Sequence, residues 1–237
     1  MKKLLIILVL AGALAASVYY FYQNAQAAST PEEVAAEAKT QVIAHRGYWN
    51  IEGSAQNSLS ALKAAQEIGA YGSEFDVQMT RDGHLVVIHD SMVNRTTDGI
   101  GAVNFMTLEE LKQLDAGVKF GYPGQRIPTL EETLDCIAKE APKHMYIDLE
   151  IKDQRPYVVD KTIEMLEAYG LLEKTVIDSF DAQTLLYIHK EYPHVKYHCQ
   201  PPVRMERFEE RVLENACALA VPLRFSDAEI QELIDLA

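Results

Sequence analysis

The sequence predicts an α/β fold with a mostly parallel sheet, either open or closed into a barrel. Along its 237 residues, short apolar runs rich in β-branched side chains alternate with amphipathic stretches at helical spacing. Several of the apolar runs also end in charged side chains. In a parallel α/β domain the carboxyl ends of the strands meet on one face, where catalytic groups gather. The pattern therefore predicts both an architecture and the place of a site.

The alternation resolves into strands and helices along one predicted domain, residues 40–237, with a strand-poor, turn-rich excursion at about 91–128. The predicted strands are Gln41–His45, Ser73–Val77, Met145–Ile151, Thr175–Asp178, Val195–Cys199 and Ala216–Val221. The predicted helices are Ser58–Ile68, Leu108–Leu114, Leu130–Ala138, Tyr157–Tyr169, Ala182–Tyr192 and Arg204–Asn215. Capping boxes mark helix starts at Thr107 with Glu110, Thr129 with Glu132 and Ser226 with Glu229.

One connection, between Val77 and Leu85, is too short for a crossover helix and indicates a hairpin. Asp82-Gly83 is typical of a two-residue hairpin loop. If these two residues form the loop, counting outward places Asp76 opposite His89. Residues directly opposite each other on one face lie about 5 Å apart. This register predicts a carboxylate beside an imidazole.

The N-terminus has the features of an export signal. Lys2 and Lys3 precede an uncharged run from Leu4 to Tyr22, and Ala25-Gln26-Ala27 offers a small-residue cleavage site. The run is also just long enough to span a bilayer. We therefore expect residues 1–27 to be a signal peptide or a membrane anchor. The domain would be exported (periplasmic or extracellular) or anchored facing outside the cytoplasm, after a polar spacer helix at 28–39.

Composition restricts the partners. The net charge of −13 at pH 7 argues against a nucleic-acid partner, because phosphate backbones repel an acidic protein. Any anionic substrate must instead meet a local cationic group. The three cysteines, Cys136, Cys199 and Cys217, have a spacing that fits no metal-binding or redox motif.

Three acidic residues form a candidate metal site. Glu74 and Asp76 are two apart in a predicted strand and so point to the same face, and Glu150 lies in a later strand. A set made only of carboxylates suits a hard cation, Ca²⁺ or Mg²⁺, and not zinc. Without a cation such a cluster would repel itself and raise the pKa values of its members.

His45 and His89, each at the end of an apolar run, are candidates for an acid/base pair. Hydrolysis at phosphorus needs one proton removed from the nucleophile and one delivered to the leaving alkoxide, which two imidazoles can do near neutral pH. Arg46 and Lys152 are the cations that could hold a phosphate. The remaining histidines are interpreted as turn or surface residues: His84, His144, His189, His194 and, in a predicted strand, His198.

These residues lie within ordered motifs that resemble the glycerophosphodiester phosphodiesterase family. The motifs are Ile43–Gly47, Glu74–Val77, Thr80–Gly83, Val86–Asp90, Asn94–Gly99, Ile127–Glu132 and Glu150–Lys152. The resemblance runs from about Gln41 to the C-terminus. It implies a TIM-type (β/α) barrel that hydrolyses glycerophosphodiesters to glycerol 3-phosphate and an alcohol. It also implies a cyclic phosphate intermediate, formed when the glycerol 2-hydroxyl attacks phosphorus.

The resemblance implies a role for each candidate residue. Glu74, Asp76 and Glu150 would hold the divalent cation. His45 and His89 would act as the acid/base pair. Arg46 and Lys152 would contact the phosphate.

The sequence departs from the family in two places. Ala55-Gln56-Asn57-Ser58 stands where the family has a Pro-Glu-Asn-Thr-like stretch, so Gln56 replaces an acid. Gln56 and Asn57 are expected to support the site, with weaker metal binding or a slower reaction as the result. The sequence also ends at Ala237, inside a predicted helix, whereas the family continues with a further strand and helix. The barrel is therefore expected to lack its last strand and helix.

Two other functions remain open on the sequence. A phosphatidylinositol phospholipase C-like enzyme would use similar two-histidine chemistry. Substrate assays would distinguish it from a glycerophosphodiester phosphodiesterase. A degenerate, non-catalytic barrel would bind phosphodiesters or a partner, and would take up a metal without turnover.

Overall fold

The computed structural model describes residues 6–9, 17–20, 41–49, 53–140, 146–199, 216 and 218–222. In these residues nine strands form one sheet, in the order β3–β2–β1–β9–β8–β7–β6–β4–β5. Because β3 also pairs with β4, the sheet closes on itself, while β5 forms a hairpin with β4. The predicted α/β fold with a closed barrel is confirmed.

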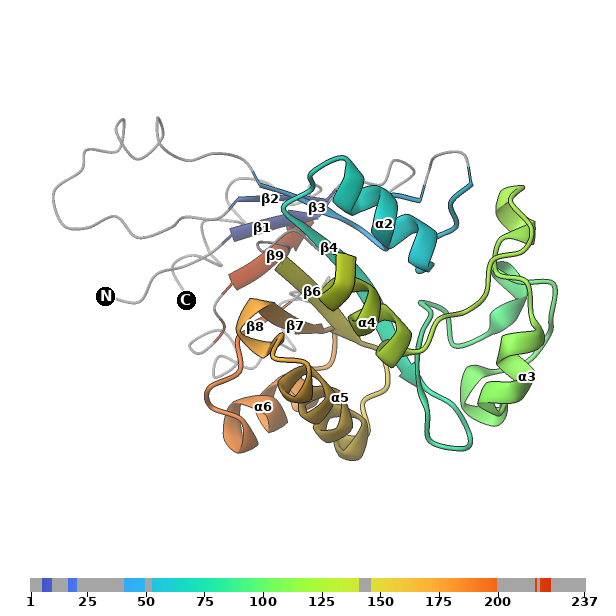
Figure 1. Cartoon of the computed structure of the whole chain (residues 1–237). Helices are drawn as coiled ribbons and strands as arrows, with labels where there is room; N and C mark the ends of the chain where they lie inside the picture. The colour runs from blue at the N-terminus through green and yellow to red at the C-terminus, as the bar shows by residue number, and fades with distance from the viewer. Residues whose placement is uncertain are drawn as a thin grey trace, which may run out of the picture.

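The strands that match the predicted parallel sheet are neighbours in chain order. They are β3 (Gln41–Ala44), β4 (Gly72–Met79), β6 (Tyr146–Ile151), β7 (Thr175–Ser179), β8 (Tyr197–Cys199) and β9 (Ala218–Pro222). Each pairs in parallel with the next. The helices α2 (Leu59–Glu67), α4 (Leu130–Glu140), α5 (Pro156–Ala168) and α6 (Ala182–Glu191) lie against the outside of the sheet (Figure 1).

Two short strands from the N-terminal apolar run complete the ring. β1 (Ile6–Val9) pairs in parallel with β9, and β2 (Ser17–Tyr20) pairs antiparallel with both β1 and β3. In the part of the chain that the structure describes, no helix is both long and apolar enough to cross a membrane. The export signal or anchor stays a prediction. The predicted spacer, the predicted helix Arg204–Asn215 and the Ser226 capping box lie outside the described residues.

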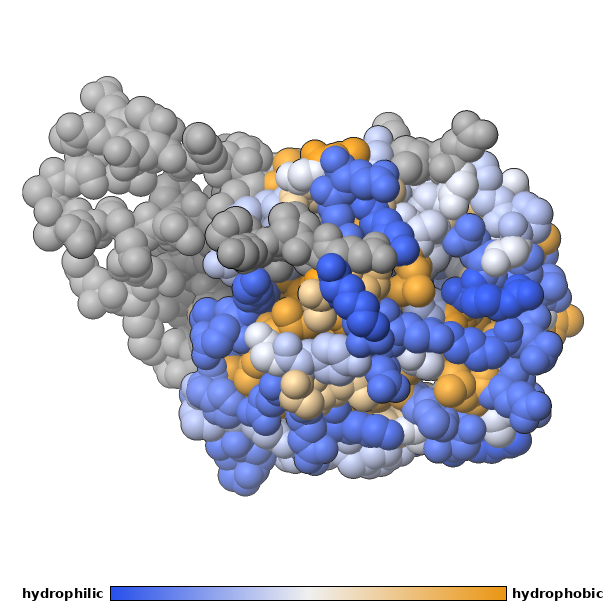
Figure 2. Space-filling view, in the orientation of Figure 1, coloured by the Kyte–Doolittle hydropathy of each residue, from blue (hydrophilic) through white to orange (hydrophobic). Residues whose placement is uncertain are grey.

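Alternation along the strands separates the core from the barrel interior. Phe75, Val77, Leu149 and Ile151 belong to the large apolar core, which also includes residues of α4, α5 and α6. The residues that alternate with them are Glu74, Asp76, Asp148 and Glu150, which are also buried. Because side chains alternate across a strand, these four point into the barrel. The barrel thus has an apolar outer layer and a charged inner one. On the face shown in Figure 2, hydrophilic residues cover most of the described surface.

The β4–β5 hairpin differs from its predicted register by one residue. β5 spans Leu85–Val87, and the pairs Val77–Val87 and Met79–Leu85 leave Arg81, Asp82 and Gly83 as a three-residue loop. Gly83 has φ +83°, the left-handed conformation that closes such a loop. The prediction of a two-residue loop was therefore wrong. Asp76 faces Ile88, whose N–H donates to the Asp76 carbonyl at 3.0 Å, and does not face His89.

The excursion at 91–128 packs around a small core of its own. It contains η1 (Val93–Arg95), η2 (Val103–Phe105), α3 (Leu108–Gln113) and η3 (Val118–Phe120). A separate cluster of buried apolar side chains joins it to Val86 and Ile88. The capping boxes at Thr107 and Thr129 are both present. The excursion lies beyond the end of β4 (Figure 1).

The loop after β3 has a demanding backbone. Arg46 and Asn57 are the two non-glycine residues with positive φ, 58° and 56°, among the described residues. The Asn57 N–H donates to the Arg46 carbonyl at 2.9 Å. Gly47, at φ +76°, lies against α2 so closely that an added Cβ would be 2.7 Å from the Ala61 backbone. Left-handed residues of this kind concentrate at functional sites.

We therefore expect Gly47→Ala to destabilise the protein more than Gly53→Ala. Gly53 has a similar φ of +79° with open space around it, so its substitution measures the left-handed penalty alone, about 1–2 kcal/mol. At Gly47 the clash with α2 adds about 1–3 kcal/mol. Denaturant unfolding of the two variants gives the comparison. Equal losses of stability would show that the loop does not depend on this close approach.

Candidate functional site

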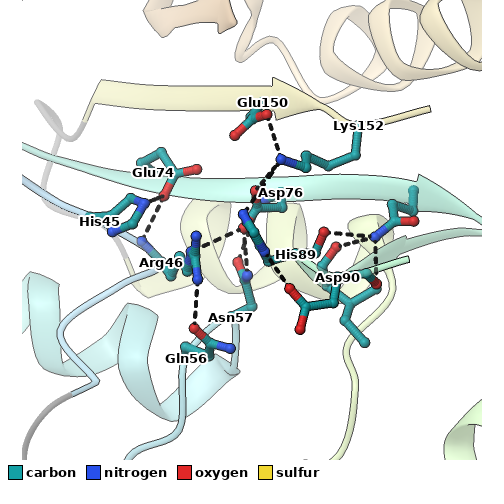
Figure 3. Close-up of polar contacts among 12 residues, drawn as sticks. His45, Arg46, Gln56, Asn57, Glu74, Asp76, His89, Asp90, Glu150 and Lys152 are labelled. Atoms are coloured by element: carbon teal, nitrogen blue, oxygen red, sulfur yellow. Dashed lines mark hydrogen bonds and ion pairs between the residues drawn. The ribbon is translucent and has the colours of Figure 1, made fainter. Parts of the chain in front are cut away.

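The predicted site residues meet at the carboxyl ends of β3, β4 and β6 and at the residues after β5 (Figure 3). His45 and Arg46 follow β3, Glu74 and Asp76 lie on β4, and His89 follows β5. The last two residues, Glu150 and Lys152, lie at the end of β6 and just beyond it. Side chains distant in sequence thus gather at one mouth of the barrel, as in a parallel α/β domain.

The three candidate metal ligands lie close enough to share one ion. One oxygen from each of Glu74, Asp76 and Glu150 lies within 4.8 Å of the others, and all three residues are buried. Burial, with the charges of Asp76, Asp148 and Glu150, raises the pKa of Glu74 well above its usual range. Burial, with Asp178 and Asp76, raises the pKa of Glu150 to about 8. These carboxylates therefore lack sufficient positive charge around them.

This donor set fits a hard divalent cation. Asp76 is fully buried, and its Oδ1 has no hydrogen-bond donor among the described residues. The ammonium of Lys152 lies 4.0 Å from this oxygen, beyond hydrogen-bond distance. A buried carboxylate oxygen without a donor is costly unless a positive charge faces it. Together with Glu74 and Glu150, Asp76 gives a set of three buried carboxylates, which matches the preference of Ca²⁺ and Mg²⁺ for oxygen ligands.

Arg46 joins three of the site's side chains. Its backbone N–H donates to Glu74 Oε2 at 2.7 Å, and its Nη1 donates to Gln56 Oε1 at 2.9 Å. Its Nε lies 3.6 Å from Asp76 Oδ2. Gln56 therefore reaches the site through Arg46, and as a neutral amide it leaves more of the guanidinium charge available than a carboxylate would.

Asn57 holds Asp76 from the other side. Its Nδ2 donates to Asp76 Oδ2 at 2.7 Å, and its Oδ1 accepts from the Asp76 backbone N–H at 3.3 Å. This reciprocal pair fixes the carboxylate while leaving Oδ1 for a cation. The left-handed backbone of Asn57 is what turns its side chain toward β4.

Lys152 lies between the acids and the second histidine. Its Nζ donates to Glu150 Oε1 at 2.7 Å and lies 3.5 Å from His89 Nε2. It also lies 5.4 Å from the centre of the Phe180 ring. Lys152 thus links the carboxylate cluster to the imidazole, a position from which an ammonium can contact a bound phosphate.

The two histidines have different surroundings. His45 Nε2 lies 3.8 Å from Glu74 Oε2, and the side chain is 33% exposed. Burial, with the nearby charge of Arg46, lowers the pKa of His45 to about 4, so it is neutral at pH 7. Burial also lowers the pKa of His89, but Asp76 and Asp90 oppose that shift.

His89 is oriented by a chain of partners that the sequence analysis left without a role. Its Nδ1 lies 2.6 Å from Asp90 Oδ1, which leaves Nε2 facing Lys152. Arg95 holds Asp90 through Nε and through Nη2, the latter at 2.9 Å. Burial alone would raise the pKa of Asp90, but the hydrogen bonds from Arg95 and His89 lower it to about 2. A fixed carboxylate behind an imidazole sets its tautomer, as in hydrolase triads.

Gln78 fixes the backbone that carries His89. Its Nε2 lies 2.8, 3.0 and 2.9 Å from the carbonyl oxygens of Ile88, His89 and Asp90. The parity of β4 predicts its direction, because Gln78 follows Glu74 and Asp76 at two-residue steps. The contact itself depends on the hairpin register, which the sequence alone did not give.

One sequence interpretation was wrong. His198, taken as a turn or surface residue, is 1% exposed, because β8 turns it into the barrel interior. There its Nε2 lies 2.9 Å from Asp148 Oδ1 and its Nδ1 lies 3.6 Å from Asp178 Oδ1. The parity of Glu150 would have identified Asp148, two residues earlier, as another inward side chain.

Buried carboxylates and histidines gathered at the strand ends of a closed (β/α) barrel are the groups that a metal-assisted hydrolase site uses. Residues 45–219 match the model of the glycerophosphoryl diester phosphodiesterase family. The chain belongs to that family.

Curated relatives and a solved structure agree with this assignment. The chain is 45% identical to the glycerophosphodiester phosphodiesterase of Caldanaerobacter subterraneus subsp. tengcongensis, over 67% of this chain and 65% of that protein. It is 35% identical to that of Bacillus subtilis, over 65% of this chain and 56% of the relative. The chain thus spans less than two thirds of the length of these relatives. The crystal structure of a glycerophosphodiester phosphodiesterase from Parabacteroides distasonis is 27% identical, with a TM-score of 0.63, over 82% of this chain and 88% of the other.

Asp90→Asn is expected to lower the turnover of a phosphodiester substrate about a hundredfold or more, with little change in KM. The amide keeps the shape but removes the charge that holds His89 in its tautomer. Because Asp90 raises the pKa of His89, its loss should also move the His89 limb of the pH–rate profile to lower pH. Steady-state kinetics across pH give both readouts.

Asp135→Asn is the matched control, because Asp135 bonds Lys139 and Tyr169 and belongs to no part of the site. A pH–rate profile unchanged by Asp90→Asn would show that Asp90 does not tune His89.

Proposed function

We propose that this chain hydrolyses glycerophosphodiesters to glycerol 3-phosphate and an alcohol, with a divalent cation, Ca²⁺ or Mg²⁺. The observation that carries the proposal is the convergence of three buried carboxylates, two cations and two histidines at one barrel mouth. Membership of the family supplies the reaction class. A cellular role in glycerol and lipid metabolism follows from that substrate class.

The cation would be held by Glu74, Asp76 and Glu150. When bound, it would neutralise charge on the phosphoryl oxygens and lower the pKa of the attacking hydroxyl. Arg46 and Lys152 flank this cluster, so they would bind the remaining phosphate oxygens and orient the phosphorus.

The histidines would move the protons. His45, neutral at pH 7, is suited to accept a proton, and His89 has a carboxylate behind it that favours its charged form. One imidazole would take the proton of the attacking glycerol 2-hydroxyl while the other protonates the leaving alkoxide. Water would then open the cyclic phosphate with the same two groups.

Room for the alcohol lies beside His89. A cavity of about 490 Å³ opens there, bordered by Lys152 and by residues that include Asp90, Asn94 and Arg95. A cavity of this volume can hold a small polar alcohol or a larger head group.

We also propose that the apolar run from Leu4 to Tyr22 exports the domain or anchors it outside the cytoplasm, a role in which β1 and β2 would no longer pair with β9 and β3. The paired lysines before the run and the small residues after it support this. N-terminal sequencing of protein recovered from a bacterial host distinguishes cleavage after Ala27 from retention, and recovery of uncleaved protein in the cytoplasm would argue against both.

Glycerol 3-phosphate release from glycerophosphocholine tests the activity. We expect turnover by the full chain with Ca²⁺ or Mg²⁺, none with a chelator, and a loss of about a hundredfold or more in His45→Ala. His194→Ala is the control, since His194 is exposed and pairs with Glu167 away from the site.

Two other outcomes of the activity assay would favour the alternative functions. Metal binding without turnover on any phosphodiester would favour the non-catalytic barrel. Turnover of phosphatidylinositol with none of glycerophosphodiesters would favour the phospholipase C-like reading.

A further inference from the structure

The interior of the barrel holds more acid than the candidate metal site uses. Register places Asp76 beside Glu150, Glu150 beside Asp178 and Asp178 beside His198, across four neighbouring strands. In a parallel row Glu74 lies beside Asp148. All of these side chains are buried. The two aspartates that bind no cation in the proposed reaction, Asp148 and Asp178, are thus direct neighbours of two proposed ligands.

His198 lies between these two aspartates. Its Nε2 is 2.9 Å from Asp148 Oδ1, its Nδ1 is 3.6 Å from Asp178 Oδ1, and the side chains are 1%, 4% and 4% exposed. A neutral imidazole has only one N–H, so it would turn a lone pair toward one carboxylate. Both ring nitrogens can face carboxylates favourably only when both carry a proton. Although burial opposes the charged form, Asp178 and Asp148 raise the pKa of His198 to about 9, which agrees with this geometry.

His198 is one of three cationic groups that face the described acids of the interior. The acidic side chains are Glu74, Asp76, Asp148, Glu150 and Asp178. They face the guanidinium of Arg46, the ammonium of Lys152 and the imidazolium of His198. Among the described residues, the acids of the interior therefore outnumber its cations.

We propose that His198 is a positioning residue for the metal site: an imidazolium that holds Asp148 and Asp178 behind the ligands and offsets the negative charge that they add beside the cation. The inference rests on the proposed metal dependence. It does not require turnover, because the charge acts on cation binding itself. Without the charge of His198, the two aspartates would add more negative charge beside Glu74 and Glu150 and would attract a cation more strongly.

Calorimetric titration of the chelator-treated full chain with CaCl₂ tests the inference, because two single variants should change the Ca²⁺ affinity in opposite directions. His198→Gln removes a positive charge, so we expect Ca²⁺ to bind about tenfold more tightly. Asp178→Asn removes a negative charge, so we expect binding about tenfold weaker. The double variant has the same net charge as the wild type and should bind Ca²⁺ within about twofold of it.

A role in packing alone gives a different result. It predicts weaker binding in both single variants and weaker binding still in the double variant, which would overturn the inference. Equal affinity in all the proteins would overturn it too. If His198→Gln does not fold, the double variant decides: near-wild-type affinity supports the inference and weak binding contradicts it. Failure of the wild type to bind Ca²⁺ or Mg²⁺ would overturn the proposed metal dependence as well, whereas binding without turnover would affect only the proposed reaction.

Discussion

Repulsion among buried carboxylates is the constraint on which the rest of this structure depends. Closing a parallel sheet into a barrel turns alternate side chains inward, and in this chain five inward positions of β4, β6 and β7 are acidic: Glu74, Asp76, Asp148, Glu150 and Asp178. Their repulsion is strong because the interior has a low dielectric constant. The arrangement is stable only with cations close by, and in the described part of the chain Arg46, Lys152 and His198 lie beside these acids.

The backbone around the site is arranged to deliver those cations. Arg46 adopts a left-handed conformation, which directs its N–H to Glu74 while its guanidinium reaches Asp76 and Gln56. Asn57 adopts the same conformation and clamps Asp76. Left-handed non-glycine residues cost free energy and persist only where their surroundings determine them. Here the close packing of Gly47 on α2 and the carboxylates on β4 do so.

Much of this architecture could be predicted from the sequence. Period-two and period-3.6 patterns located the strands and helices, because they follow directly from which side chains are buried. The ends of the apolar runs located the candidate site residues, because the carboxyl ends of parallel strands meet on one face of the domain. The hairpin register could not be read in the same way. A two-residue and a three-residue hairpin loop both fit Asp82-Gly83. The choice between them shifts every cross-strand partner of β4 and β5 by one residue.

The contacts of the residues that orient the site could not be predicted from the sequence either, and the reason is the same for each. Gln78, Arg95 and His198 act through partners that lie near them only in the folded chain. A polar residue in a strand is usually solvated, so His198 gave no local signal of burial.

The most direct test of this account is the unfolding temperature of the full chain with a chelator, with Ca²⁺ and with Mg²⁺, at about pH 6 and about pH 9. A cation bound only by the folded state stabilises it. The account predicts stabilisation that is larger at the higher pH. Burial and the charge of Asp178 raise the pKa of Glu150 to about 8. Glu150 must therefore lose its proton before it can bind the ion, and it does so more fully at the higher pH. Glu150→Gln should remove most of this effect. An unfolding temperature that neither ion changes at millimolar concentration would contradict the claim that the barrel interior is built for a divalent cation.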